Sequence, residues 1–492
     1  MDLRRSNMAD VAAQAVSAIV GRGCYLALQV FLARSLGPHE FGLYAIGWTV
    51  TGLIGTFAPV GMPQTVLRYG VAGRRALRTA PIAIAAIAGM FCFAVLMAIA
   101  SPLANLLFAE PTAAPVILAL APSVPLLCIF AVLASALRSS QANLASAAVG
   151  ALQFVLYFGL TVVGFSAGVP HTPVMAGHVY TVAIMLTLFP TGWMLYQLAP
   201  SSTIPEVQNL LKFGLVTMMI HSASVMNLWA DRVVIGVMAD AQAVGLYQVA
   251  SQLAMLALVL RVAVISVFEA RVPKLAHSGA PLPDVSREFL SASRILLHVS
   301  TPGLICLALT AKFWTAALFG ADYIPAAVPL AILALGQLIQ TFTGPSLTAL
   351  HMTGGERTAL HLTIGTCLLN VIGNVALIPL WGLAGSAVAS SVANIALVGA
   401  SLFLLLRTGR LRLYFTGIGD ILWATLFSAV AAALISYSFG VDSTFSIVTT
   451  LIVAYAAYGI VVALCCRVED EVLDLGRALL RRRMHLQQDT RV

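Results

Sequence analysis

The distribution of charge along the chain constrains its fold more than any other feature. Of 492 residues, only 27 are Lys or Arg and 19 are Asp or Glu, and nearly all of them fall in short gaps between long apolar runs. One helical crossing of a ~30 Å hydrocarbon core needs about 20 mostly apolar residues. The sequence holds fourteen such runs and therefore predicts an all-α integral membrane protein with about 14 transmembrane helices.

These runs leave little chain for anything outside the membrane. The connections on the side opposite to the N-terminus are the shortest, so we expect no large domain there. The predicted spans cover residues 11–34, 41–62, 80–101, 114–137, 143–166, 175–197, 213–238, 245–270, 295–319, 325–350, 358–380, 382–406, 416–438 and 444–466.

Basic residues are distributed unequally between the two sides of the predicted bundle. With a cytoplasmic N-terminus, 22 of the 27 basic residues fall on the cytoplasmic side, and Arg34, Arg232 and Lys312 lie towards the opposite side. Cytoplasmic loops of membrane proteins carry such an excess. The pattern predicts that both termini are cytoplasmic, and it explains the net charge of +8 without a nucleic-acid partner.

Motifs of soluble enzymes and metal sites are missing from the sequence. All seven cysteines lie in apolar runs with no Cys-x-x-Cys pair, which is typical of packing residues. One Gly-x-Ser-x-Gly match, at residues 164–168, closes the fifth run, where the strand that a nucleophile elbow needs is not available. We therefore expect no enzyme activity, no metal and no cofactor.

The first twelve spans contain a sign of duplication. Gly42-Leu43-Tyr44 opens the second span and Gly245-Leu246-Tyr247 opens the eighth. Six spans separate the two tripeptides, so the two halves are predicted to be parallel repeats with the transport path between them. The expected organisation is a six-helix bundle at 1–200, a second at 201–406, two further helices at 407–466 and a basic amphipathic cytoplasmic tail at 467–492.

Five segments in the same order resemble the prokaryotic polysaccharide and lipopolysaccharide exporters. They are ARSLGPHEFGLYAIG, LLKFGLVTMM, DRVVIGVMADAQAVGLYQVASQLA, FGADYIPAAVPLAIL and NVALIPLWGLAGSAVAS. The resemblance implies a Wzx-type oligosaccharide flippase of the multidrug, oligosaccharidyl-lipid and polysaccharide (MOP) exporter superfamily, with two MATE-like six-helix bundles. Such proteins move undecaprenyl-diphosphate-linked repeat units to the periplasmic leaflet of the bacterial inner membrane for O-antigen, capsule or exopolysaccharide synthesis. The implied partners are this lipid-linked oligosaccharide, the bilayer, and the polymerase and other membrane proteins of the pathway.

A diphosphate crossing hydrocarbon needs cations, and the guanidinium of Arg stays charged and binds phosphate oxygens in pairs. Arg22 lies eleven residues into the first span, about 17 Å deep, and Gln29 falls on the same helix face. Arg261 lies in the inner part of the eighth span. These three residues are candidates for the substrate cavity, while an Arg held in place for packing, gating or snorkelling is the alternative.

Charged residues of the seventh span are further candidates. Arg232 and His221 share a helix face and are candidates for substrate contact. Asp231 points about 100° away from Arg232, so we expect it to pair with Arg34 or Arg22 of the other half, as a gate or an ion-coupling site.

Two further sets of residues carry weaker signals. Glu269, at the cytoplasmic edge of the eighth span, is a further candidate for gating or ion coupling. Asn370 and Asn374 stack one turn apart in the eleventh span, where packing between helices is favoured over sugar contact.

Three alternative functions stay open at this point. A multidrug or cation antiporter and a lipid II flippase share the superfamily. A membrane polysaccharide polymerase or ligase belongs to another class, but the short outer loops disfavour it.

Overall fold

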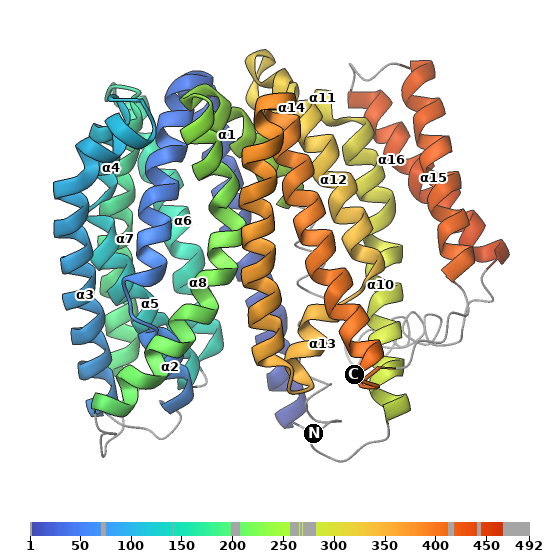
Figure 1. The fold of residues 1–492 in the computed structure, drawn as a ribbon. Helices are drawn as coiled ribbons and strands as arrows, with labels where there is room; N and C mark the ends of the chain where they lie inside the picture. The colour runs from blue at the N-terminus through green and yellow to red at the C-terminus, as the bar shows by residue number, and fades with distance from the viewer. Residues whose placement is uncertain are drawn as a thin grey trace, which may run out of the picture.

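In a computed structural model of the chain, every regular element of the described residues is a helix (Figure 1). The described residues are 2–69, 75–140, 142–197, 207–255, 265, 268, 282–411, 418–439 and 444–465. The first half holds α1 (Asp2–Phe57), α2 (Met62–Tyr69), α3 (Arg75–Pro102), the π-helix η2 (Leu103–Leu107), α4 (Ala113–Leu120), α5 (Ser123–Ser139), α6 (Asn143–Ser166) and α7 (Pro173–Gln197). The rest holds α8 (Val207–Met238), a helix over 241–255, α10 (Leu282–Leu309), α11 (Ala311–Phe319), the 3-10 helix η3 (Ala321–Ala326), α12 (Ala327–Phe342), α13 (Ser346–Met352), α14 (Glu356–Arg407), α15 (Ile418–Phe439) and α16 (Thr444–Cys465).

The helices confirm a multi-pass integral membrane protein. In the described part of the chain, 8 helices are long and apolar enough to cross a membrane. The count rises to 9 when α8 is included as one span, because α8 bends by 49° between Ala223 and Val225. Helices α15 and α16 contain shorter apolar stretches, Trp423–Ile435 and Val448–Val461.

Two of these elements each consist of two helices that meet at a kink, where the sequence predicts two spans each. Helix α1 contains Gly37 with φ of 78°, directly before Pro38, and α14 contains Gly382 with φ of 56°. A positive φ suits glycine, and proline is tolerated at the first position of the helix that follows. The chain reverses direction at Gly382, so that the two arms of α14 lie side by side (Figure 1, orange).

Three predicted spans contain a break; one of them is still found as a single span, and the other two end earlier than predicted. The span predicted at 114–137 is found at Ala113–Ser139, with a break between α4 and α5 at Pro122, which cannot donate a backbone hydrogen bond. The one predicted at 295–319 divides into α10 and α11 at Thr310, which leaves the helical conformation. The one predicted at 325–350 ends earlier, because Gly344 with φ of 61° and Pro345 separate α12 from α13.

Figure 1 shows α2–α7 on the left, α10–α14 on the right and the pair α15–α16 at the right edge, while α1 begins at the bottom centre, near the marked N-terminus. Helix α8 packs on both α1 and α14, and α15 and α16 pack on α10. We call the face with α2 and α13 the lower face and the face with α4 and α11 the upper face, as drawn. The largest buried apolar cluster spans both halves, from Leu28 in α1 to Ala387 in α14.

Candidate functional site

The two Gly-Leu-Tyr segments meet on the upper side of the bundle, and this contact joins the halves. A Cβ placed on Gly42 would overlap the carbonyl group of Ala241 and lie 3.2 Å from the nitrogen of Gly245. A Cβ on Gly245 would in turn lie 3.0 Å from the nitrogen of Gly42. Only glycine permits such a close backbone approach, which is typical of helix contacts in membranes.

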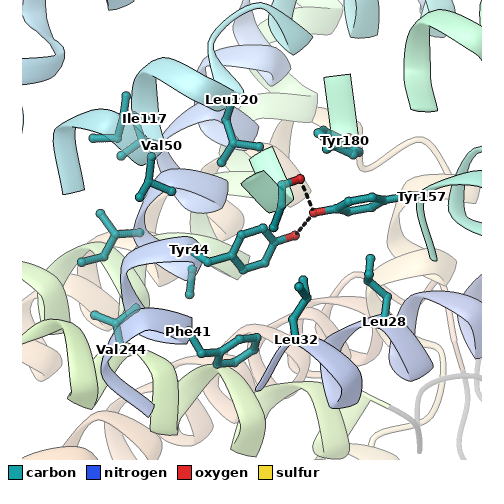
Figure 2. Packing of buried hydrophobic residues seen from close by; sticks show 14 of the residues in the cluster. Leu28, Leu32, Phe41, Tyr44, Val50, Ile117, Leu120, Tyr157, Tyr180 and Val244 are labelled. Carbon is teal, nitrogen blue, oxygen red and sulfur yellow. Dashed lines mark hydrogen bonds between the residues drawn. The ribbon is translucent and has the colours of Figure 1, made fainter. Parts of the chain in front are cut away.

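The tyrosine of each tripeptide is fully buried, and the two tyrosines have different partners. Tyr44 shares a hydrogen bond with Tyr157 at 3.0 Å, and Tyr157 also lies 3.0 Å from the carbonyl of Ala176 (Figure 2). Tyr247 donates to Oδ2 of Asp231 at 2.9 Å. The same repeat position therefore stabilises an apolar and hydroxyl core in the first half and a carboxylate in the second.

Asp231 is the centre of a buried polar cluster between α8 and α14. Its side chain is only 7% exposed, and Nδ2 of Asn370 donates to its Oδ1 at 2.7 Å. Asn374 and Ser390 donate in turn to the amide oxygen of Asn370, at 2.7 and 3.3 Å. The side-chain oxygens of Asn374 and Ser386 are buried without a partner in the described structure. The cluster is rich in oxygen atoms around one carboxylate.

No basic side chain of the described residues forms a salt bridge with this carboxylate. Arg232, the next residue, instead donates to Gln248, to Ser251 at 2.8 Å and to the carbonyl of Leu228 at 2.9 Å. Its guanidinium also lies 5.4 Å from the ring centroid of Trp229. In the described part of the chain, Asp231 is therefore held by hydrogen bonds without a salt bridge, while the charge of the adjacent Arg232 still acts on its carboxylate.

The first arm of α1 holds further polar contacts between the halves. Gln252 donates to the hydroxyl of Tyr25 at 3.3 Å. Near the upper face, Arg34 donates to the carbonyls of Leu318 and Ala317 at the end of α11, and Tyr323 donates to the carbonyl of Ala33 at 2.9 Å. Cations favour the carbonyl-rich C-terminus of a helix. These contacts close the upper side of the interface.

The predicted site residues do not form one cluster. Arg22 is exposed, whereas Gln29 is fully buried and neither atom of its amide has a partner among the described residues. His221 is exposed on the first segment of α8. Arg261 and Glu269 lie outside the described residues. The pairing of Asp231 with Arg34 or Arg22 is replaced by the hydrogen bonds of Asp231 to Tyr247 and Asn370.

Sequence reasoning missed four members of the polar clusters, namely Tyr247, Gln248, Ser251 and Ser390. A signal for Tyr247 was present, because it closes the repeated tripeptide. For Asn370 the sequence favours packing between helices, and its amide does contact α8, through the carboxylate of Asp231.

Comparisons with known proteins agree with this architecture. The chain matches the family described as "Polysaccharide biosynthesis protein" over residues 31–328. No curated protein matches it by sequence. Its fold is similar to that of a lipid II flippase, MurJ, in an inward closed conformation, with a TM-score of 0.76 and 16% identity over 92% of this chain and 98% of that chain.

Two other solved structures share the fold. One is an inward-facing multidrug resistance MATE family transporter of the MOP superfamily, with a TM-score of 0.63 and 15% identity over 82% of this chain and 98% of that one. The other is a MOP superfamily transporter from Pyrococcus furiosus, with a TM-score of 0.59 and 16% identity over 82% and 95% of the two chains. The family match covers more than half of the chain, and the fold matches cover most of it. The chain therefore belongs to the polysaccharide biosynthesis protein family, and it has the MOP superfamily fold seen in MurJ and MATE transporters.

Proposed function

We propose that the protein is a flippase for undecaprenyl-diphosphate-linked oligosaccharide repeat units, which it moves from the cytoplasmic to the periplasmic leaflet of a bacterial inner membrane. The product serves the synthesis of a surface polysaccharide such as O-antigen, capsule or exopolysaccharide. The observation that carries the proposal is a match to polysaccharide biosynthesis proteins in a chain with a transporter fold. In this proposal the protein makes and breaks no covalent bonds, and the pathway polymerase acts on the translocated repeat unit.

The proposed topology has fourteen crossings, in two six-crossing halves at 1–200 and 201–406 and a further pair at 407–466. Helices α1 and α14 each supply two crossings, because each breaks at a glycine with positive φ. Basic residues support cytoplasmic termini and a cytoplasmic tail at 467–492, because most of those described lie near the lower face. They are Arg68, Arg138, Lys212, Arg287, Arg294, Arg357, Arg407 and Arg410.

We propose that substrate passes between the halves, with Arg22, Gln29 and Arg261 facing the path and His221 beside it. Arg232 joins them in a conformation that frees it from Gln248 and Ser251. Arg22 supports this role best, because it is exposed at a depth where snorkelling to the interface is poor.

The buried cluster around Asp231 is proposed to couple transport to an ion. Binding of a proton or a cation there lowers the cost of burying a carboxylate that has no salt bridge in the described structure, and so favours the arrangement that the structure shows. Arg34 and Glu269 are proposed as gate residues on the two sides of the membrane. The upper contacts of Arg34 with α11 support its assignment.

A lipid II flippase is the second candidate, because similarity to MurJ extends over 92% of this chain. Lipid II is also an undecaprenyl diphosphate carrying sugar, so both candidates need the same cationic path. A multidrug antiporter is disfavoured by the family match, which is to polysaccharide biosynthesis proteins.

The test is the leaflet in which the lipid-linked repeat unit accumulates in a deletion strain. Spheroplasts are treated with a membrane-impermeant enzyme that cleaves the sugar. We expect the intermediate to be protected and the surface glycan to be lost, and both to be restored by the wild-type gene. An intermediate that is fully accessible without the protein contradicts the proposal. Normal surface glycan with blocked cell-wall synthesis favours lipid II as the substrate.

A further inference from the structure

A cavity of about 560 Å³ lies in the first half of the chain, on its lower side. Its walls come from the second arm of α1, from α2, α5, α6 and α7, and from the first segment of α8. Gly52 and Gly55 line it without filling it. Sites for small molecules have volumes of about 300–1,000 Å³, so this cavity is large enough for a head group of a few rings.

The charges around the cavity favour an anion. Arg138, in the last turn of α5, lines the cavity, and no acidic residue is among its described lining residues. Nη2 of Arg138 donates to Oγ of the buried Ser135 at 3.0 Å, which orients the side chain. The other donors of this guanidinium have no partner among the described residues, and such free donors bind phosphate oxygens well.

The opposite end of the cavity holds aromatic rings and one amide side chain. Gln153 lies ten residues into α6, about 15 Å along the helix from its lower end. It is 5% exposed and donates to the hydroxyl of Tyr180 at 3.3 Å. The ring of Tyr180 packs 4.6 Å from that of Trp48, and Phe154 lines the cavity beside Gln153. Amide and hydroxyl groups beside aromatic rings suit a sugar, which presents hydroxyls at its edge and C–H groups on its face.

Helix α8 from the second half closes one side of this cavity. Gly61, with φ of 66°, is packed against the backbone of Gly214, where an added Cβ would overlap the carbonyl group. Met218 and His221 of the same segment line the cavity just before the bend of α8. Movement of this segment between the halves therefore changes access to the cavity.

We propose that this cavity binds the glycosyl diphosphate head group of the lipid-linked substrate. Arg138 receives a phosphate oxygen near the lower face, and Gln153, Tyr180 and Phe154 receive the first sugar. The distribution fits a lipid in the adjacent leaflet, whose phosphates lie at the membrane surface and whose sugar extends into the protein. This inference rests on the proposed function and adds to it a loading site within one half of the bundle.

The first experiment measures binding of citronellyl-diphosphate N-acetylglucosamine to the purified full-length protein by isothermal titration calorimetry. We expect Arg138→Gln to raise the Kd by about tenfold or more, because a charge-assisted hydrogen bond is lost. The matched control is Arg357→Gln, which removes an exposed Arg of the lower face outside the cavity and should leave the Kd unchanged. An unchanged Kd for Arg138→Gln overturns the proposal, as does an equal rise in the control.

A second measurement does not depend on removing the charge. Ala134→Cys places a thiol in the cavity wall, and Thr408→Cys places one on the exposed lower face, each in a background without the seven native cysteines. The glycosyl diphosphate should slow alkylation of Cys at 134 by N-ethylmaleimide and leave the rate at 408 unchanged. Equal alkylation of position 134 with and without the compound overturns the proposal.

The outcomes separate this site from the proposed function. If the wild type moves the lipid-linked intermediate between leaflets, and neither Arg138→Gln nor alkylation reports binding, the loading site is wrong and the flippase function stands. If the wild type does not move the intermediate but the cavity binds the glycosyl diphosphate, the flippase function is wrong and the binding site stands.

Discussion

Replacing Gly42 with Ala should open the upper contact between the two halves. The new methyl group would overlap the carbonyl of Ala241, which is backbone and cannot move aside as a flexible side chain would. Overpacking of this kind costs about 1–3 kcal/mol. The cost falls only on conformations in which the halves touch here. The ratio of upper-open to upper-closed molecules should therefore rise by about 5- to 150-fold.

Distances between spin labels on the upper face measure this ratio. Cysteines introduced at Ala167, after α6, and at Asp322, in η3, are exposed and lie in different halves. We expect Gly42→Ala to move molecules towards the longer distance, and Gly245→Ala to act in the same direction, because its Cβ would meet the backbone at Pro38. The background protein lacks the seven native cysteines, so that labels attach only at the two introduced sites.

Gly150→Ala is the matched control for this experiment. Gly150 is in the interior of α6, and nothing lies within 4 Å of a Cβ added there. The control should keep the wild-type distances and gain slightly in helix stability. If the distances of Gly42→Ala equal those of wild type, the close glycine contact does not hold the upper side closed. If Gly150→Ala changes them equally, the effect is not specific to the contact.

Three other substitutions test separate parts of the account. Asp231→Asn puts a donor where the carboxylate accepts from Tyr247 and Asn370, so one hydrogen bond is lost. We expect transport to be at least tenfold slower while gel filtration shows that the protein is still folded. Transport at the wild-type rate contradicts ion coupling at Asp231. Tyr157→Phe leaves a buried polar group unpaired and should lower the free energy of unfolding by about 1–3 kcal/mol, and an unchanged melting temperature refutes the reasoning. Arg22→Ala should abolish transport at an unchanged protein level, and full activity removes Arg22 from the path.

The membrane fold is predictable from the sequence because length and hydropathy alone determine whether a helix can span a bilayer. The kinks at Gly37 and Gly382 also follow from local chemistry, since Gly37 lies in the predicted gap at 35–40 and Gly382 is the first residue of the predicted span 382–406. Similarly, a rotation of 100° per residue correctly separates Asp231 from Arg232. The break at Pro122 coincides with a proline that indicates an interrupted span, whereas the break at Thr310 is less predictable, because neither glycine nor proline lies beside it.

The polar partners are not predictable from one helix at a time. Whether Asp231 meets Arg34 or Asn370 depends on how α8 is rotated against its neighbours, and packing over the whole interface fixes that rotation. Arg138 shows the same limit. In the sequence it is one of many basic residues at a span end, and only the fold places it beside a cavity that Gln153 and Tyr180 line from other helices.

Transport by the purified protein in liposomes tests the central claim most directly. The liposomes contain an undecaprenyl-diphosphate-linked oligosaccharide in both leaflets, and an impermeant glycosidase is added outside. The account predicts that cleavage goes to completion with wild-type protein and stops at the outer-leaflet fraction with Arg22→Ala or without protein. An inner-leaflet fraction that stays protected in the presence of wild-type protein contradicts the proposed function.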